Sequence, residues 1–189
     1  MLRVAVLISG GGSNLKSLIE SQDNNYYKID IVIADRNCGG LSIAENAGIR
    51  AIIIDKKIYK NELFKRIDEE LSNIDLIVLA GFLSIADSNF IKKWERKIIN
   101  IHPSLLPKYG GKGMYGIHVH EAVIANKENE SGCSVHYVTD TIDGGDIIMQ
   151  AKVLVKENDT PQVLQKRVLE QEHKILPLTV KKLSEDFEV

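Results

Sequence analysis

The chain has 189 residues, of which 44% are hydrophobic and 26% charged, and its formal net charge at pH 7 is -2. This length and composition are typical of one globular domain with a sizeable core, and the charge argues against a nucleic-acid or anionic-membrane partner. No apolar run approaches the roughly 20 residues of a membrane-spanning helix. Cys38 and Cys133 form no CxxC pair, so we expect reduced thiols and a cytoplasmic protein.

The first half of the chain alternates β-branched runs with segments of helical spacing. The apolar runs predict strands over 4–9, 29–34, 51–55, 76–80 and 98–101. The segments between them predict helices over 14–21, 41–47, 59–71 and 85–94. Continuous apolar strands that alternate with amphipathic helices are typical of a parallel sheet covered on both faces. We therefore predict a doubly wound, Rossmann-like α/β fold.

The second half of the chain has a different pattern. A loop rich in glycine and proline over 103–117 precedes a predicted helix over 119–126. Two extended runs, 134–139 and 147–155, are joined by a short segment of turn residues. Such a pair is typical of antiparallel strands. The mostly parallel sheet should therefore carry an antiparallel edge in its C-terminal half.

A long helix is predicted at the C-terminal side, over 160–185. Thr160 is its expected N-cap and Pro161 its first helical residue, and Pro177 should kink or break it. No repeat or linker interrupts the pattern, so we predict a single domain over 1–189.

The glycine-rich segment after the first predicted strand is a candidate phosphate site. It reads Ser9-Gly10-Gly11-Gly12-Ser13-Asn14 and leads into the first predicted helix. Glycines let backbone amides approach an anion, and a helix N-terminus adds unpaired N–H groups and partial positive charge. The segment lacks both the Walker A sequence and the G-x-G-x-x-G spacing, because position 15 is Leu. A purely structural turn is the alternative.

Asn100 and His102 form a second candidate site at the end of the fifth predicted strand. Residues two apart in a strand face the same side, so the amide and the imidazole should project together. An asparagine can stabilise an oxyanion, and a histidine can assist proton movement. Pro103 and Pro107 then end the regular structure and leave an opening. The alternative is a structural histidine.

Asp143 marks a third candidate site, in the turn after the strand that carries His136. It precedes Gly144 and Gly145, where the backbone can bend sharply and aim a carboxylate. An aspartate that bonds only its own turn is the alternative. His102, His136 and Asp143 could in principle bind a metal, but they lack a dedicated metal spacing, so no metal is predicted.

Together these segments resemble the folate-dependent formyltransferases, most closely the members that act on a glycinamide ribonucleotide in purine biosynthesis. The matching pieces run in order over nearly the whole chain, at 6–15, 78–82, 100–109, 134–140, 142–145 and 171–173. The Asn-x-His-x-Ser-Leu-Leu-Pro stretch is common to the wider group. The Gly-Ser-Asn-Leu loop and the Gln-Glu-His near the C-terminal side narrow the resemblance.

The resemblance implies formyl transfer from 10-formyltetrahydrofolate to the amine of 5-phosphoribosylglycinamide, without a covalent enzyme intermediate. The residues implied to hold the phosphorylated acceptor are Gly11, Gly12, Ser13, Asn14 and, at the ribose, Glu172. The residues implied to be catalytic are Asn100, His102 and Asp143. The residues implied to receive the reduced folate are Leu83, Ser84, Ile85, Ala86, Asn100, Val138, Asp140 and Asp143, with Lys60 near the folate tail.

The chain departs from the family pattern at two places. Ser84 stands where the family often has arginine, a change that should matter little if that segment contacts the folate through its backbone. The segment Gly110-Gly111-Lys112-Gly113-Met114-Tyr115-Gly116 is longer than the connection in many members.

Other functions remain as alternatives. Within the class, the chain could be a sugar-nucleotide N-formyltransferase, whereas a tRNA formyltransferase would need a further domain and a basic surface. From another class, it could be a non-catalytic nucleotide-binding Rossmann module, for which Asp35 near the second strand would supply the acid. We expect small-molecule substrates, no nucleic acid, no membrane, and a monomer or homodimer.

Overall fold

Seven strands form one mixed sheet in the structure, a computed structural model that describes residues 1–186. The strands are β1 (Leu2–Ile8), β2 (Tyr27–Ala34), β3 (Arg50–Ile53), β4 (Leu76–Leu79), β5 (Ile98–His102), β6 (Glu130–Tyr137) and β7 (Ile147–Leu154). Their order in the sheet is β3-β2-β1-β4-β5-β6-β7. The pairs from β3 to β5 are parallel, and β6 and β7 add antiparallel pairs. The predicted doubly wound sheet with an antiparallel edge is confirmed.

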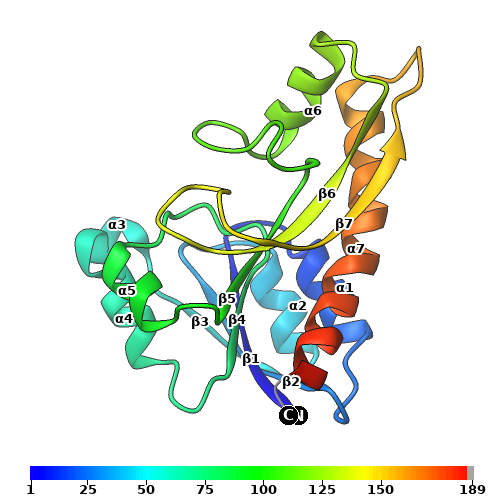
Figure 1. Cartoon of the computed structure of the whole chain (residues 1–189). Helices are drawn as coiled ribbons and strands as arrows, with labels where there is room; N and C mark the ends of the chain where they lie inside the picture. Colours follow the sequence, from blue (N-terminus) through cyan, green and yellow to red (C-terminus); the bar gives the residue numbers. More distant parts are fainter. Residues whose placement is uncertain (187–189) are drawn as a thin grey trace.

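Helices cover both faces of the sheet. They are α1 (Ser13–Glu20), α2 (Gly40–Asn46), α3 (Lys56–Tyr59), α4 (Leu63–Glu69), α5 (Ser88–Lys93), α6 (Ile117–Ala125) and α7 (Pro161–Asp186), with a 3-10 turn η1 at Lys60–Glu62. Core residues of α1, α2 and α7 pack on one face and those of α4 and α5 on the other (Figure 1). In β1, Val4 and Val6 point to the first face, Ala5 and Leu7 to the second. Burial on both faces explains the continuous apolar runs. Within residues 1–186, no helix has the length and apolar character that crossing a membrane requires.

Two predicted helices differ from those observed. The single helix expected over 59–71 is wrong, because Lys60, the first residue of η1, has a φ of 47° and interrupts the helix between α3 and α4. The helix expected from residue 85 begins at Ser88, where the Asp87 side chain caps it by accepting from Phe90 N at 2.9 Å. The residues between β4 and Asp87 are therefore a loop.

In the C-terminal half, the predicted strands and helices are present, but some of their bounds differ from prediction. β6 covers residues 130–137 instead of 134–139, since it pairs with β7 from Glu130 onward. The Thr160 hydroxyl accepts from Val163 N at 3.3 Å, which confirms the N-cap. The prediction is that Pro177 kinks or breaks this helix; α7 continues through Pro177, so a break there is wrong. Buried neighbours such as Leu176 and Val180 hold this part of the helix against the sheet and outweigh one lost backbone hydrogen bond.

Candidate active site

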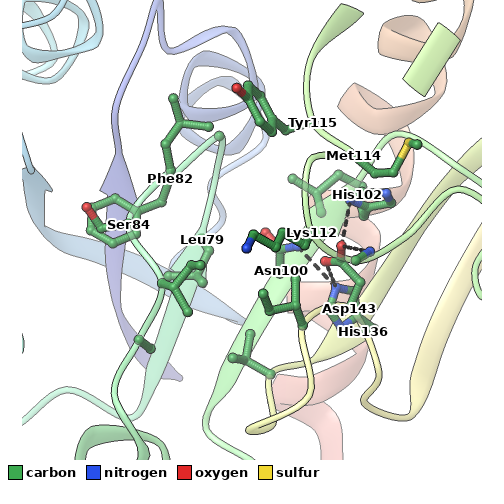
Figure 2. Close-up of a pocket in the computed structure, with 18 of the residues that line it drawn as sticks. Leu79, Phe82, Ser84, Asn100, His102, Lys112, Met114, Tyr115, His136 and Asp143 are labelled. Atoms are coloured by element: carbon green, nitrogen blue, oxygen red, sulfur yellow. Dashed lines mark hydrogen bonds and ion pairs between the residues drawn. The ribbon is translucent and has the colours of Figure 1, made fainter. Parts of the chain in front are cut away.

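A cavity of about 680 Å³ opens at the carboxyl ends of β4 and β5. Its walls are the loop after β4, the loop after β5 and the turn after β6 (Figure 2). Apart from Lys60, the residues predicted for catalysis and for the folate line it, namely Leu83, Ser84, Ile85, Ala86, Asn100, His102, Val138, Asp140 and Asp143. Ligands of doubly wound folds bind at this end of the strands, so the cavity is the candidate active site.

Asn100 is oriented by a histidine on the neighbouring strand. The β5–β6 register places Asn100 opposite His136, and Asn100 Nδ2 lies 3.1 Å from His136 Nε2. The other ring nitrogen, His136 Nδ1, donates to Tyr137 O at 2.8 Å. In the tautomer that has its proton on Nδ1, His136 carries its lone pair on Nε2 and accepts from the Asn100 amide there. This bond fixes the amide and leaves its second N–H for the cavity.

His102 is buried between two oxygen acceptors. Its Nε2 donates to Tyr109 O at 2.8 Å, and its Nδ1 lies 3.6 Å from Asp143 Oδ2. Burial lowers the pKa of His102, although the Asp143 charge and the Tyr109 carbonyl oppose that effect. The ring is then neutral at pH 7, with its proton on Nε2. A second proton gained at Nδ1 would face the Asp143 carboxylate.

Asp143 links the two histidines to the loop after β5. Its Oδ2 accepts from Gly111 N at 2.9 Å, and its Oδ1 lies 3.5 Å from His136 Nε2. Burial alone raises the pKa of Asp143, but His136, the charge of His102 and the Gly111 N–H together hold that pKa below its usual value. The side chain is therefore a carboxylate at neutral pH. Figure 2 shows it between His102 and His136.

The turn that carries Asp143 is packed tightly against the end of β6. A Cβ atom on Gly145 would lie only 1.9 Å from Tyr137 O, so no other residue fits there without a shift of the backbone. The close approach aims the carboxylate back at β5. This supports an active-site role for the turn over a purely local one.

The residues predicted for the acceptor form a second cluster beside the cavity. Gly11, Gly12, Ser13 and Asn14 lie at the carboxyl end of β1, two strand spacings or roughly 10 Å from β5. Gly12 has a φ of 78°, and no side chain caps the N-terminus of α1. Asn14 Nδ2 donates to Glu172 Oε2 at 2.7 Å. The predicted phosphate and ribose groups are thus brought together across 158 residues of sequence.

Glu172 is almost fully buried, and this burial raises the pKa of its carboxyl group while the Asn14 hydrogen bond opposes the rise. Among the described side chains, Asn14 Oδ1 is a buried atom that has no hydrogen-bond partner. A buried polar atom without a partner is uncommon in folded proteins. Its presence here is consistent with a polar ligand at this cluster.

Sequence reasoning missed several cavity residues. His136 is expected from the sequence only as a possible metal ligand, although its two-residue spacing from Ser134 puts both side chains on one face of the predicted strand. Lys56 lines the cavity and Lys60 does not. Further lining residues that were not predicted are Arg36, Lys112, Met114 and Tyr115. In the described part of the chain, no group of three His, Cys, Asp or Glu residues is placed to hold a metal ion.

Comparison with known sequences finds close relatives. The family described as Formyl transferase matches residues 2–180. The chain is 46% identical over 183 residues to the human trifunctional purine biosynthetic protein adenosine-3, a match that covers 93% of the chain but 18% of that protein. It is 38% identical over 188 residues to phosphoribosylglycinamide formyltransferase of Escherichia coli (strain K12), covering 95% and 85% of the two chains. The chain thus spans about a fifth of the length of its trifunctional relatives.

Comparison with solved structures gives the same result. Glycinamide ribonucleotide transformylase 1 from Symbiobacterium toebii has a TM-score of 0.92 and 33% identity, covering 98% of this chain and 89% of that one. Phosphoribosylglycinamide formyltransferase from Anaplasma phagocytophilum has a TM-score of 0.88 and 39% identity, covering 98% and 88%. The likeness therefore includes the antiparallel edge and α7 as well as the parallel half.

Proposed function

Because the chain belongs to the formyl transferase family, we propose that it transfers a formyl group from 10-formyltetrahydrofolate to the amine of 5-phosphoribosylglycinamide. This is a step of purine biosynthesis. One observation carries the proposal: the cavity holds Asn100, His102 and Asp143 as a connected group, directly beside a wall suited to an aromatic donor. The assignment of roles to these residues is part of the proposal.

The donor occupies the wall formed by Leu83–Ala86, with Val138 and Asp140 across from it. Leu83 and Ile85 are 48% and 69% exposed and line the cavity, so they offer apolar surface to a ligand. A flat pteridine ring would cover them. The backbone N–H and C=O groups of this loop and the Asp140 carboxylate supply hydrogen-bonding partners for its polar edge.

The acceptor binds with its 5′-phosphate on the backbone of Gly11–Asn14 and its ribose hydroxyls on Glu172. Uncapped N–H groups at the start of α1 suit a phosphate. From there the glycinamide amine extends across the end of β4 toward Asn100. The roughly 10 Å between the ends of β1 and β5 suits a ribose and a short amide chain.

The chemistry is acyl transfer between two bound substrates. The neutral amine attacks the formyl carbon, the carbonyl oxygen becomes an oxyanion, and the carbon–N10 bond then breaks as the carbonyl re-forms. The Asn100 N–H stabilises the oxyanion. His102 supports the developing charge once it has gained a proton at Nδ1, the nitrogen that faces Asp143. Asp143, through a water molecule, takes the proton that leaves the amine and returns it to N10. Cys133 is buried in β6 and has no part in these steps.

The proposal extends to organisation and location. One domain holds the phosphate site in its N-terminal half and the folate and catalytic sites in its C-terminal half. Cys38 and Cys133 are free thiols, which suits a reducing cytoplasm. The chain acts on small molecules, as a monomer or a homodimer.

The test is a formyl-transfer assay with purified protein and 10-formyltetrahydrofolate. The release of deformylated folate measures turnover. Three acceptors are compared: 5-phosphoribosylglycinamide, an amino-sugar nucleotide and charged initiator tRNA. We expect turnover with the first alone. Efficient use of the sugar nucleotide or of the tRNA would replace the proposed acceptor, and no turnover with any of the three would contradict the proposal.

A non-catalytic dinucleotide-binding module is the rival that the structure disfavours most directly. In such modules an acid at the end of the second strand accepts the ribose hydroxyls. Asp35 stands at that position here, but its carboxylate is fully buried and already bonded to Arg36 and Ser84. The acid is therefore not free for a ribose.

A further inference from the structure

Asp35 is a buried carboxylate that bonds two residues of the cavity wall, Arg36 and Ser84. It follows β2, and its side chain is 0% exposed. Its two oxygens accept from Arg36 Nε at 2.8 Å and from Arg36 Nη2 at 3.0 Å. Oδ2 also accepts from Ser84 Oγ at 2.5 Å. A buried charge is maintained only where such partners compensate its lost hydration, so these contacts hold Arg36 and Ser84 in fixed places.

The same cluster reaches the rest of the donor wall. Ser9 Oγ accepts from Leu83 N at 2.8 Å, and Ser9 also helps to lower the pKa of Asp35. Burial raises the pKa of Asp35, but Arg36, Ser84 and Ser9 together lower that pKa below its usual value. The carboxylate is thus charged throughout the neutral range and can hold Arg36 by charge as well as by geometry.

Arg36 presents a cation to the cavity. Its side chain is 34% exposed, and Arg36 and Lys56 both line the cavity. Because Nε and Nη2 bond Asp35, the edge of the guanidinium that carries Nη1 faces away from the carboxylate. That edge can donate to another anion. Lys56 follows β3, its backbone N–H donates to Asp35 O at 3.0 Å, and its ammonium adds a second positive charge.

The position of this cation matches one end of a long ligand. In the sheet order, β2 lies three strands from β5, which is roughly 14 Å at the usual strand spacing. The reacting group lies at β5. The proposed donor carries carboxylates beyond an aromatic ring and an amide bond, at the end remote from its formyl group.

We propose that Arg36 is a specificity-determining residue that binds the tail carboxylates of the donor, and that Asp35 is the positioning residue that holds Arg36 and Ser84. The inference rests on the proposed function. It also explains the departure from the family at position 84. Where the family often has arginine, this chain has Ser84, whose hydroxyl bonds Asp35. Arg36, which follows β2, supplies the positive charge instead.

The first test compares two donors in wild type and Arg36→Gln. One donor is 10-formyltetrahydrofolate, and the other is 10-formyltetrahydropteroate, which lacks the glutamyl group and its carboxylates. Arg36→Gln should raise KM for the full donor about 10-fold, the size of one charge-assisted hydrogen bond, with kcat and the acceptor KM nearly unchanged. It should not affect the truncated donor. Arg50→Gln, which removes an exposed arginine paired with Glu70, is the matched control and should change neither donor.

The second test addresses the positioning residue. Asp35→Asn should raise the KM for the full donor as Arg36→Gln does, and the double variant should be no worse than either single variant, because both remove the same interaction. Ser84→Ala should show the same pattern with a smaller, few-fold effect. If Asp35→Asn is too unstable to purify, Ser84→Ala and Arg36→Lys are used for this test instead. Arg36→Lys keeps the charge and should recover part of the donor affinity.

The outcomes separate this inference from the proposed function. If wild type transfers formyl groups but Arg36→Gln loses the same factor with both donors, the inference is wrong and the function stands. If wild type transfers from neither donor, the function is wrong. Calorimetric binding of tetrahydrofolate and tetrahydropteroate then decides the inference alone, and equal affinities of wild type and Arg36→Gln for both ligands would overturn it.

Discussion

Asp143 has a φ of 54°, a conformation that aspartate and asparagine adopt more readily than most residues. Asp143→Asn should therefore keep the turn, and its side-chain oxygen can still accept from Gly111 N. The variant loses only the proton acceptor. We expect turnover to fall by roughly 10²-fold or more, the usual contribution of a positioned acid or base, while both substrates still bind. Steady-state kinetics and calorimetry measure the two effects.

The control for Asp143→Asn is Asp146→Asn in the same turn region. The Asp146 carboxylate is largely exposed and pairs with Arg96, so its loss should leave turnover unchanged. Near-normal turnover in Asp143→Asn would show that another group moves the proton, and the mechanism would then be wrong even if the substrates are right.

His120 on α6 predicts a measurable acid sensitivity. It is buried, its Nδ1 is without a hydrogen-bond partner among the described residues, and burial followed by the His102 charge lowers its pKa to about 4. The unfolded chain takes up this proton near pH 6.5. Stability is therefore lost as the pH falls below 6.5, by about 2 kcal/mol between pH 7 and pH 5.

His120→Leu should remove this part of the pH dependence, because it replaces the titrating group with an apolar side chain that suits the buried position. Urea unfolding at pH 7 and pH 5 gives the difference for wild type and variant. His118→Leu, on the exposed side of the same helix, should retain the wild-type dependence. Equal acid sensitivity in all three proteins would mean that His120 does not titrate as its burial suggests.

At the scale of elements, the turn from β1 into α1 depends on Gly12. A Cβ atom there would lie 2.6 Å from Gly40 Cα and 3.2 Å from Ile43 Cδ1, at a φ of +78°. Gly12→Val must therefore push the turn away from α2 and misplace the N–H groups at the start of α1. We expect acceptor affinity to fall far more than donor affinity, as measured by calorimetry with each substrate.

Gly48→Ala provides the comparison for Gly12→Val. Gly48 also has a positive φ, of +69°, but a Cβ atom there meets nothing within 4 Å. Its substitution strains the backbone without moving the candidate phosphate turn, so it should lower the melting temperature and leave both affinities intact. Equal loss of both ligands in Gly12→Val would show that the turn is only structural.

For the whole molecule, the proposed function predicts which ligand stabilises the fold. A ligand present at 100 times its Kd and bound only by the native state adds about 2.7 kcal/mol, which for a domain of this size corresponds to a rise of roughly 5–10 °C in Tm. Tetrahydrofolate should produce such a rise and NAD should not. Thermal unfolding with each ligand tests this, and stabilisation by NAD instead would favour the dinucleotide-binding alternative.

Much of the fold follows from the sequence because the relevant signals are local. β1, β2 and β4 are buried on both faces of the sheet, so their sequences are continuous apolar stretches. The apolar residues of the helices recur at helical spacing. Where the sequence misled, tertiary contacts outweighed local preference. Glu130 joined β6 through pairing with β7, and Pro177 stayed inside α7 because its surroundings are packed.

Some residues of the candidate site could be predicted from local sequence, and others are brought there only by the tertiary structure. Asn100 and His102 could be predicted together because strand geometry alone puts them on one side. Their meeting with Asp143 was set by the antiparallel return of β6 beside β5, which brings residues about forty positions apart within 3.6 Å. Arg36 gave no signal in the sequence, since it enters the cavity only through the parallel alignment of β2 and β4 around β1. A sequence determines periodicity and local geometry, whereas contacts between distant residues depend on strand order, which packing of the whole sheet decides.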